Sequence, residues 1–62
     1  MSEKEVRDMI SSKVREDTGR RVKSVFYITR SIDGEDLYGV VGNDNKLFAL
    51  TIVYNKTFDL IY

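Results

Sequence analysis

The longest unbroken run of strand-forming residues occupies positions 47–54, with the sequence LFALTIVY. Its even positions, Phe48, Leu50, Ile52 and Tyr54, are large and apolar, whereas its odd positions are smaller or mixed. Because alternate side chains of a strand point to opposite faces of a sheet, the two sets lie on different faces. The run holds no charge and no proline, so it predicts an interior strand around which the rest of the chain is arranged.

The first eighteen residues follow a helical period instead. An apolar stripe one face wide recurs at helical spacing and consists of Val6, Met9, Ile10 and Val14. Ser2 and Glu5 fit a capping box, in which each side chain satisfies an unpaired backbone N–H at the start of a helix. Gly19 can adopt the left-handed conformation that closes a helix. The pattern therefore predicts a surface helix over residues 3–18.

Turn signals divide the remainder into strands. Asp33-Gly34 lies between two runs of period two, and the sequence NDNK at 43–46 lies between the next two. A third turn is expected at 55–57, where the sequence is NKT. The predicted strands are therefore residues 21–30, 36–42, 46–54 and 57–62.

The turn positions also predict which residues face each other. The expected pairs are Phe26 with Val41, Ile28 with Gly39, Val41 with Phe48, Gly39 with Leu50, Leu37 with Ile52, Phe58 with Tyr54, Leu60 with Ile52 and Tyr62 with Leu50. All of them share one sheet face, which we expect the helix to cover, with a core of Phe26, Ile28, Val41, Phe48, Leu50, Ile52 and Leu60. The predicted fold class is α+β, a single domain over residues 1–62 with one N-terminal helix packed on a four-stranded antiparallel β-meander.

Composition restricts how such a domain can be stabilised and what it can do. A chain of 62 residues buries only about 60% of the surface that it exposes when unfolded. The sequence has no cysteine and no histidine, so disulfides and Cys/His zinc sites are excluded. Its ten basic and ten acidic residues sum to zero, which gives no overall attraction to nucleic acid or to an anionic membrane. We expect stability to come from packing, including packing against another copy.

The charges are nevertheless unevenly distributed along the chain. Residues 19–30 carry Arg20, Arg21, Lys23 and Arg30 without an acid, and residues 31–45 carry Asp33, Glu35, Asp36 and Asp44 without a base. No run of 18 apolar residues is present, and the N-terminus lacks the pattern of a signal peptide. We expect a cytoplasmic location and no membrane association.

No motif for catalysis, for a cofactor or for a metal is found. Neither a nucleophile elbow nor a glycine-rich phosphate loop occurs, and the acidic residues around 33–36 and 43–45 lack the spacing of a calcium-binding loop. Turn chemistry accounts for both acidic segments. We therefore expect a protein that is not an enzyme and that has no catalytic, cofactor-binding or metal-binding residues.

The second sheet face is the strongest candidate for a functional surface. One helix cannot cover both faces of a sheet, and the face that the prediction leaves open is apolar. Its residues are the predicted interface: Val25, Tyr27, Tyr38, Val40, Ala49, Thr51 and Val53, with Ile61 at its edge. The alternative function is a sheet-surface nucleic-acid binder that uses Arg20, Arg21, Lys23, Tyr27 and Tyr38, since basic and aromatic side chains on a sheet can bind single strands. The zero net charge favours the first of these.

The order of elements resembles a PepSY-type domain: an N-terminal amphipathic helix, a strand of the VKSVF kind at 22–26, an acidic turn and a final pair of strands. The closest local similarity is TIVYNKTFDLI at residues 51–61. PepSY domains usually have an aspartate where Tyr54 or Asn55 stands and a glycine where Phe58 stands. The resemblance implies a small non-catalytic module that restrains peptidases or binds protein partners. The predicted function is accordingly a protein-interaction module that acts through an open sheet face, with a protein partner or as a homodimer.

Overall fold

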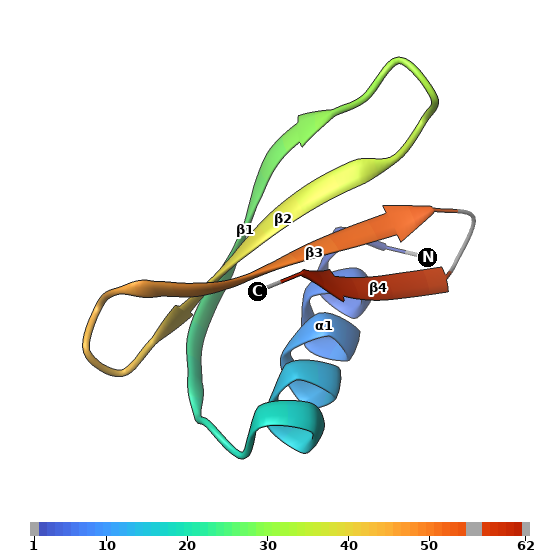
Figure 1. The fold of residues 1–62 in the computed structure, drawn as a ribbon. Helices are drawn as coiled ribbons and strands as arrows, with labels where there is room; N and C mark the ends of the chain where they lie inside the picture. Colours follow the sequence, from blue (N-terminus) through green and yellow to red (C-terminus); the bar gives the residue numbers. More distant parts are fainter. Residues whose placement is uncertain (1, 55–56, 62) are drawn as a thin grey trace.

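The computed structural model describes residues 2–54 and 57–61, and it describes side chains for residues 2–54. The elements follow one another as α1 (Glu3–Thr18), β1 (Val22–Arg30), β2 (Asp36–Gly42), β3 (Leu47–Tyr54) and β4 (Thr57–Ile61) (Figure 1). Every strand is antiparallel to the strand that precedes it, and the strand order is β1-β2-β3-β4. No helix in these ranges is long and apolar enough to cross a membrane.

Both ends of α1 are capped by the residues that the sequence indicates. The Ser2 hydroxyl oxygen accepts a hydrogen bond from the Glu5 backbone N–H at 3.2 Å, which satisfies one of the free donors of the first turn. Gly19 has a φ of 72° and donates its N–H to the Arg15 carbonyl at 2.9 Å. This is the left-handed C-terminal cap that glycine permits.

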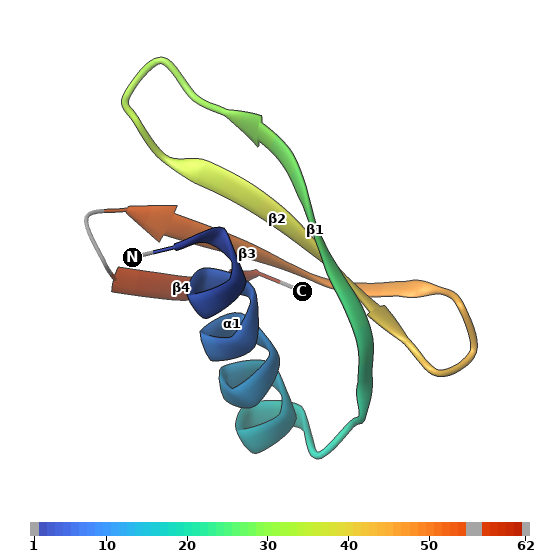
Figure 2. The ribbon, with the colours of Figure 1, turned by 180° about the vertical axis from the view of Figure 1, so that it is seen from behind.

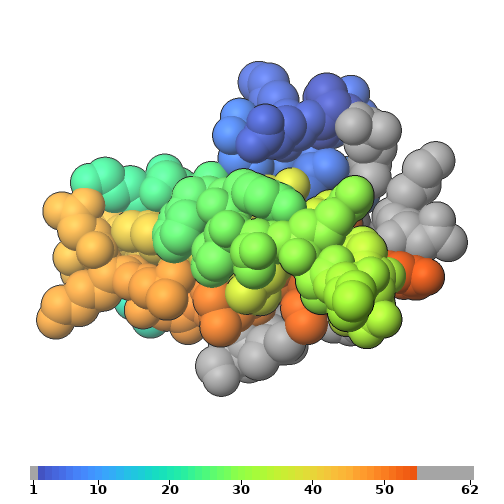
Figure 3. All heavy atoms as spheres, turned by 90° about the horizontal axis from the view of Figure 1, so that it is seen from above, coloured from blue at the N-terminus to red at the C-terminus, as the bar shows by residue number. Residues whose placement is uncertain are grey.

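The helix lies on one side of the sheet, behind it in Figure 1 and in front of it in Figure 2. Figure 3 shows the same two layers from above, with the first turns of α1 standing on one side of the strands. Ile10 and Val14 are both 0% exposed and point into the contact between the layers. The sheet contributes Tyr38, Val40, Ala49, Thr51 and Val53 to this buried layer.

The predicted packing of one helix on a four-stranded meander is wrong, although the fold is broadly α+β. The sheet whose side chains are described, and on which α1 packs, is the three-stranded antiparallel sheet of β1, β2 and β3. The backbone of β4 pairs with β3 at the edge of this sheet, and its register is shifted by one residue from the predicted register. Phe58 is paired with Val53 instead of Tyr54, and Leu60 with Thr51 instead of Ile52. The predicted place of the Leu60 side chain in the core and the predicted pair of Tyr62 with Leu50 lie outside what the structure describes.

The helix also covers the opposite face from the predicted one. Phe26, Ile28, Val41, Phe48, Leu50 and Ile52 were expected beneath it, but each of these is exposed or only half-buried. Phe48 alone of this group packs against the buried cluster. The covered face carries small central side chains, such as Ala49 and Thr51, and these let a helix approach closely. Bulky side chains at the centre of the other face would hold a helix away, which gives a physical reason for the choice of face.

The sheet has three register shifts, of which one lies between Val22 and Ser24 at the start of β1; the other two explain the remaining differences in pairing. Register shifts occur in β1 between Tyr27 and Thr29, and between β2 and β3 at Val40 and Val41. The second shift leaves Phe48 as an extra residue between the pairs Val41–Leu47 and Val40–Ala49, which is a β-bulge. The bulge accounts for the packing of Phe48 against the buried cluster.

The β1–β2 connection also differs from a two-residue turn at Asp33-Gly34. The Ser31 N–H donates to the Glu35 carbonyl at 2.8 Å, and the Ser31 hydroxyl accepts from the N–H groups of Asp33 and Glu35. The five-residue loop pairs Phe26 with Gly39 instead of Val41. This change of two positions keeps Phe26 on the face that the alternation predicts.

Candidate interaction surface

The predicted interface is the interior of the domain. Val40 and Thr51 are 0% exposed, and Ala49, Tyr38 and Val53 are 3%, 6% and 8% exposed. Val25 is half-buried and packs against the same cluster, while Tyr27 is 46% exposed at its edge. Because α1 covers this face, all of these residues except Tyr27 hold the two layers together and are not free to bind a partner.

The uncovered face is the one that alternation places opposite to α1. We call it the open face and define it by Phe26, Leu37, Gly39, Val41, Leu47, Leu50 and Ile52. Its two most exposed members are Leu47 at 52% and Phe26 at 43%. The other apolar members are half-buried because they pack against one another across the strands. Within residues 2–54 the one helix, α1, lies on the other side of the sheet, and no strand covers this face (Figures 1 and 2).

The centre of the open face is occupied by Phe26, which lies across the strand to Gly39. A Cβ atom at Gly39 would lie 2.5 Å from Cζ of Phe26 and 3.0 Å from Cδ1 of Leu47. The absence of a side chain at Gly39 therefore leaves room for the end of the Phe26 ring over the neighbouring strand, a close approach found at glycines in sheets. The result is an apolar surface, with an apolar hollow lined by Leu47, Phe48, Ala49 and Leu50 beside it.

Residues of the alternative nucleic-acid site are dispersed. Tyr38 is buried and meets Tyr27 edge to face at 5.3 Å between ring centroids, so it cannot stack on a base. The Tyr27 hydroxyl donates to the Asp36 carboxylate at 3.1 Å. Desolvation, followed by this hydrogen bond, raises the pKa of Tyr27 above its ordinary value. The two aromatic rings are thus committed to contacts within the domain.

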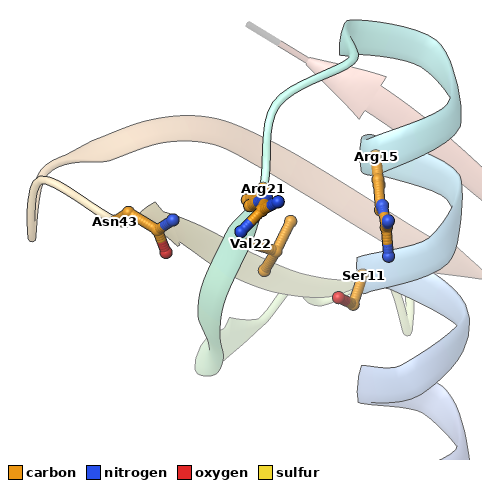
Figure 4. A pocket seen from close by; sticks show the side chains of 5 residues that line it. All are labelled: Ser11, Arg15, Arg21, Val22 and Asn43. Atoms are coloured by element: carbon orange, nitrogen blue, oxygen red, sulfur yellow. The ribbon is translucent and has the colours of Figure 1, made fainter.

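The basic members of that set surround the start of β1. Arg20 lies 4.1 Å above the Phe48 ring and 3.8 Å from the Asp44 carboxylate, and Lys23 donates to the Asn45 side chain. Arg21 lines a polar cleft between α1 and the β2–β3 turn, together with Ser11, Arg15, Val22 and Asn43 (Figure 4). Figure 4 shows Arg15 and Arg21 on different elements, with Val22 between them. Within residues 2–54 neither guanidinium has a carboxylate partner, and both are exposed to solvent.

The charges gather at opposite ends of the sheet because β2 separates its two hairpin turns. At the end with the β2–β3 turn stand four cations, Arg20, Arg21, Lys23 and Lys46, against one carboxylate, Asp44. Within residues 2–54, the strands and turns at the end with the β1–β2 turn carry three carboxylates, Asp33, Glu35 and Asp36, and one cation, Arg30. The sheet therefore has a positive end and a negative end. Among the described residues no cluster of acidic side chains could hold a metal ion.

Sequence reasoning missed the residues of the open face because it assigned them to the core. The signal that could have identified them is the inward stripe of α1, in which only Ile10 and Val14 are fully buried. A stripe this narrow fits a face of small side chains better than one that carries Phe26 and Leu47.

No family model, curated protein or solved structure matches the chain.

Proposed function

We propose that this chain is a small non-catalytic interaction module that binds a protein partner through its open face. The observation that carries the proposal is the uncovered apolar surface around Phe26 and Leu47. A contiguous apolar patch on a small domain usually marks an interaction site. The alternative, a nucleic-acid binder, lacks its second aromatic platform because Tyr38 is buried.

Position-specific photo-cross-linking in a native lysate tests this proposal. A photoreactive phenylalanine derivative at position 26 samples the open face, and the same derivative at position 4 samples the outer side of α1, where the Lys4 side chain is 82% exposed. We expect a discrete adduct from position 26 only. Excess unlabelled wild-type protein should remove that adduct, whereas excess Leu47→Lys protein should not. Equal adducts from both positions, or no competition, would overturn the proposal.

The identity of the adduct separates the possible partners. The PepSY resemblance implies a peptidase as the partner. The cross-linked adduct would then contain that peptidase, and the wild-type protein would inhibit it. A second copy of the chain would give an adduct of twice the 7.2 kDa mass of the monomer. An adduct with nucleic acid, removed by nuclease, would support the alternative function.

A further inference from the structure

We propose that the partner of the open face is a second copy of this chain, stacked face to face with its strands running in the opposite direction. The inference rests on the proposed function and adds the identity and orientation of the partner. In such a dimer the two-fold axis lies between the sheets and perpendicular to the strands. The interface is then isologous, which means that both copies use the same surface and make the same set of contacts.

Charge complementarity favours a second copy of the chain as the partner, and it favours stacking with opposite strand directions. The positive end of the sheet carries Lys23 and Lys46, and the negative end carries Asp33 and Glu35. When two copies stack with opposite strand directions, each positive end lies against the negative end of the other copy. With parallel strand directions, like charges would meet at both ends and oppose association. The zero net charge of the chain leaves no overall repulsion between copies.

The shape of the open face suits a flat partner of the same kind. The Phe26 ring reaches over Gly39, and two such faces can approach as the sheets of a sandwich do, about 10 Å apart. A face three strands wide and seven residues long measures about 14 by 23 Å at ordinary strand spacing. This is smaller than the roughly 800 Å² per partner of a standard interface, so the dimer should form in the micromolar to millimolar range.

Two of the three acidic residues of the negative end, Asp33 and Glu35, are free to meet a partner, whereas Asp36 is paired with Arg30. The side chains of Asp33 and Glu35 are not in an ion pair or a hydrogen bond with any residue of 2–54. Their contacts with Ser31 are made by backbone groups: both N–H groups donate to the Ser31 hydroxyl, and the Glu35 carbonyl accepts from the Ser31 N–H. Lys46 likewise uses only backbone groups within residues 2–54: its N–H donates to the Asp44 side chain, and its carbonyl accepts from the Gly42 N–H. Reversing these charges should therefore leave the fold of the monomer intact.

Sedimentation velocity up to about 1 mM, in buffer of low ionic strength, tests the inference through three variants. In the first, Asp33→Lys with Glu35→Lys makes both ends positive, and we expect dimerisation to weaken roughly tenfold. The second variant adds Lys23→Glu and Lys46→Glu, which exchanges the two ends, and affinity should return to within about threefold of wild type. The third variant, Leu47→Lys, places a charge on the open face and should give a monomer. Circular dichroism checks that each variant is folded.

Each outcome has a distinct meaning. A wild-type monomer at 1 mM overturns the second-copy inference, while the cross-linking experiment still decides the proposed function. Dimerisation that does not change in either charge variant indicates parallel stacking and overturns the orientation. A Leu47→Lys protein that dimerises like wild type, confirmed with Leu50→Lys, shows that the interface lies elsewhere and overturns the proposed function as well. The chain has no cysteine of its own, so introduced cysteines can be paired without interference. When a variant with a single cysteine at position 33 is mixed with a variant with a single cysteine at position 45, a disulfide between the two copies should form only in the antiparallel arrangement.

Discussion

Val40 and Val41 offer the sharpest test of which face is inside. They are the same residue type, adjacent in β2, and on opposite faces of the sheet. Val40 is fully buried beneath α1, whereas Val41 belongs to the open face and is half-buried. Replacing each with alanine removes the same two methyl groups and the same strand propensity, so the difference between the variants reports burial alone.

The expected magnitude follows from the burial. Two fully buried methyl groups contribute about 1.6 kcal/mol of transfer free energy, and the cavity that remains adds about 1 kcal/mol. Val40→Ala should therefore lower the free energy of unfolding by about 2.5 kcal/mol, and Val41→Ala by less than about 1 kcal/mol. The total free energy of unfolding of a domain of this length is only about 3 to 9 kcal/mol. At about 4 to 8 °C for each kcal/mol, Val40→Ala should lower the melting temperature by about 10 to 20 °C.

Urea unfolding followed by circular dichroism measures both values. Micromolar protein keeps dimerisation out of the comparison, and repetition at two concentrations checks that it does. If Val41→Ala is as destabilising as Val40→Ala, or more so, the helix does not cover the face described here. The assignment of the open face would then be wrong.

Two further predictions concern polar groups on the covered side. The Thr51 hydroxyl is buried and has no hydrogen-bond partner in the described part of the chain, so Thr51→Val should stabilise the protein by about 1 kcal/mol, whereas Thr51→Ser should destabilise it. Thermal unfolding of the two variants measures this, and a destabilised Thr51→Val would show that the hydroxyl is satisfied. The pKa of Tyr27 is raised in the folded state. The stability that Tyr27 contributes to the fold is therefore fully present below the ordinary pKa of about 10 and is lost as the pH rises through the pKa of the folded state. Absorbance titration should show Tyr27 ionising above pH 10, and its pKa should fall in Asp36→Asn; the same curve for both proteins would contradict the role of the hydrogen bond.

Local structure could be predicted from the sequence because its causes are local. Ser2 and Gly19 determine the two ends of α1, and alternation correctly places Phe26 with Gly39, and Gly39 with Leu50, on a common face. The bulge at Phe48 and the slip of β4 could not be predicted, since neither has a distinct composition. Each depends on how the strands twist after they have paired.

The choice of face could not be read from hydrophobicity. Transfer free energies favour burial of the face with Phe26, Leu50 and Ile52, because its side chains are larger. The helix instead contacts the face with Ala49 and Thr51, where close packing with Ile10 is possible. This depends on the shapes of both surfaces, which a one-dimensional pattern does not contain. The error moved the candidate site to the wrong side of the sheet, although the expectation that one apolar face is left open did not depend on it.

The order of strands has a consequence for the path by which the chain folds. Each strand pairs with the next through a short loop, so the hairpins close quickly, whereas α1 must reach strands far along the chain. We expect the sheet to form before the helix docks, with both apolar faces bare during that interval. Docking of α1 then competes with collision between unfinished chains; the rate of docking is independent of protein concentration, whereas the rate of collision rises with it. The rate of helix docking should therefore set the protein concentration above which refolding ends in aggregates.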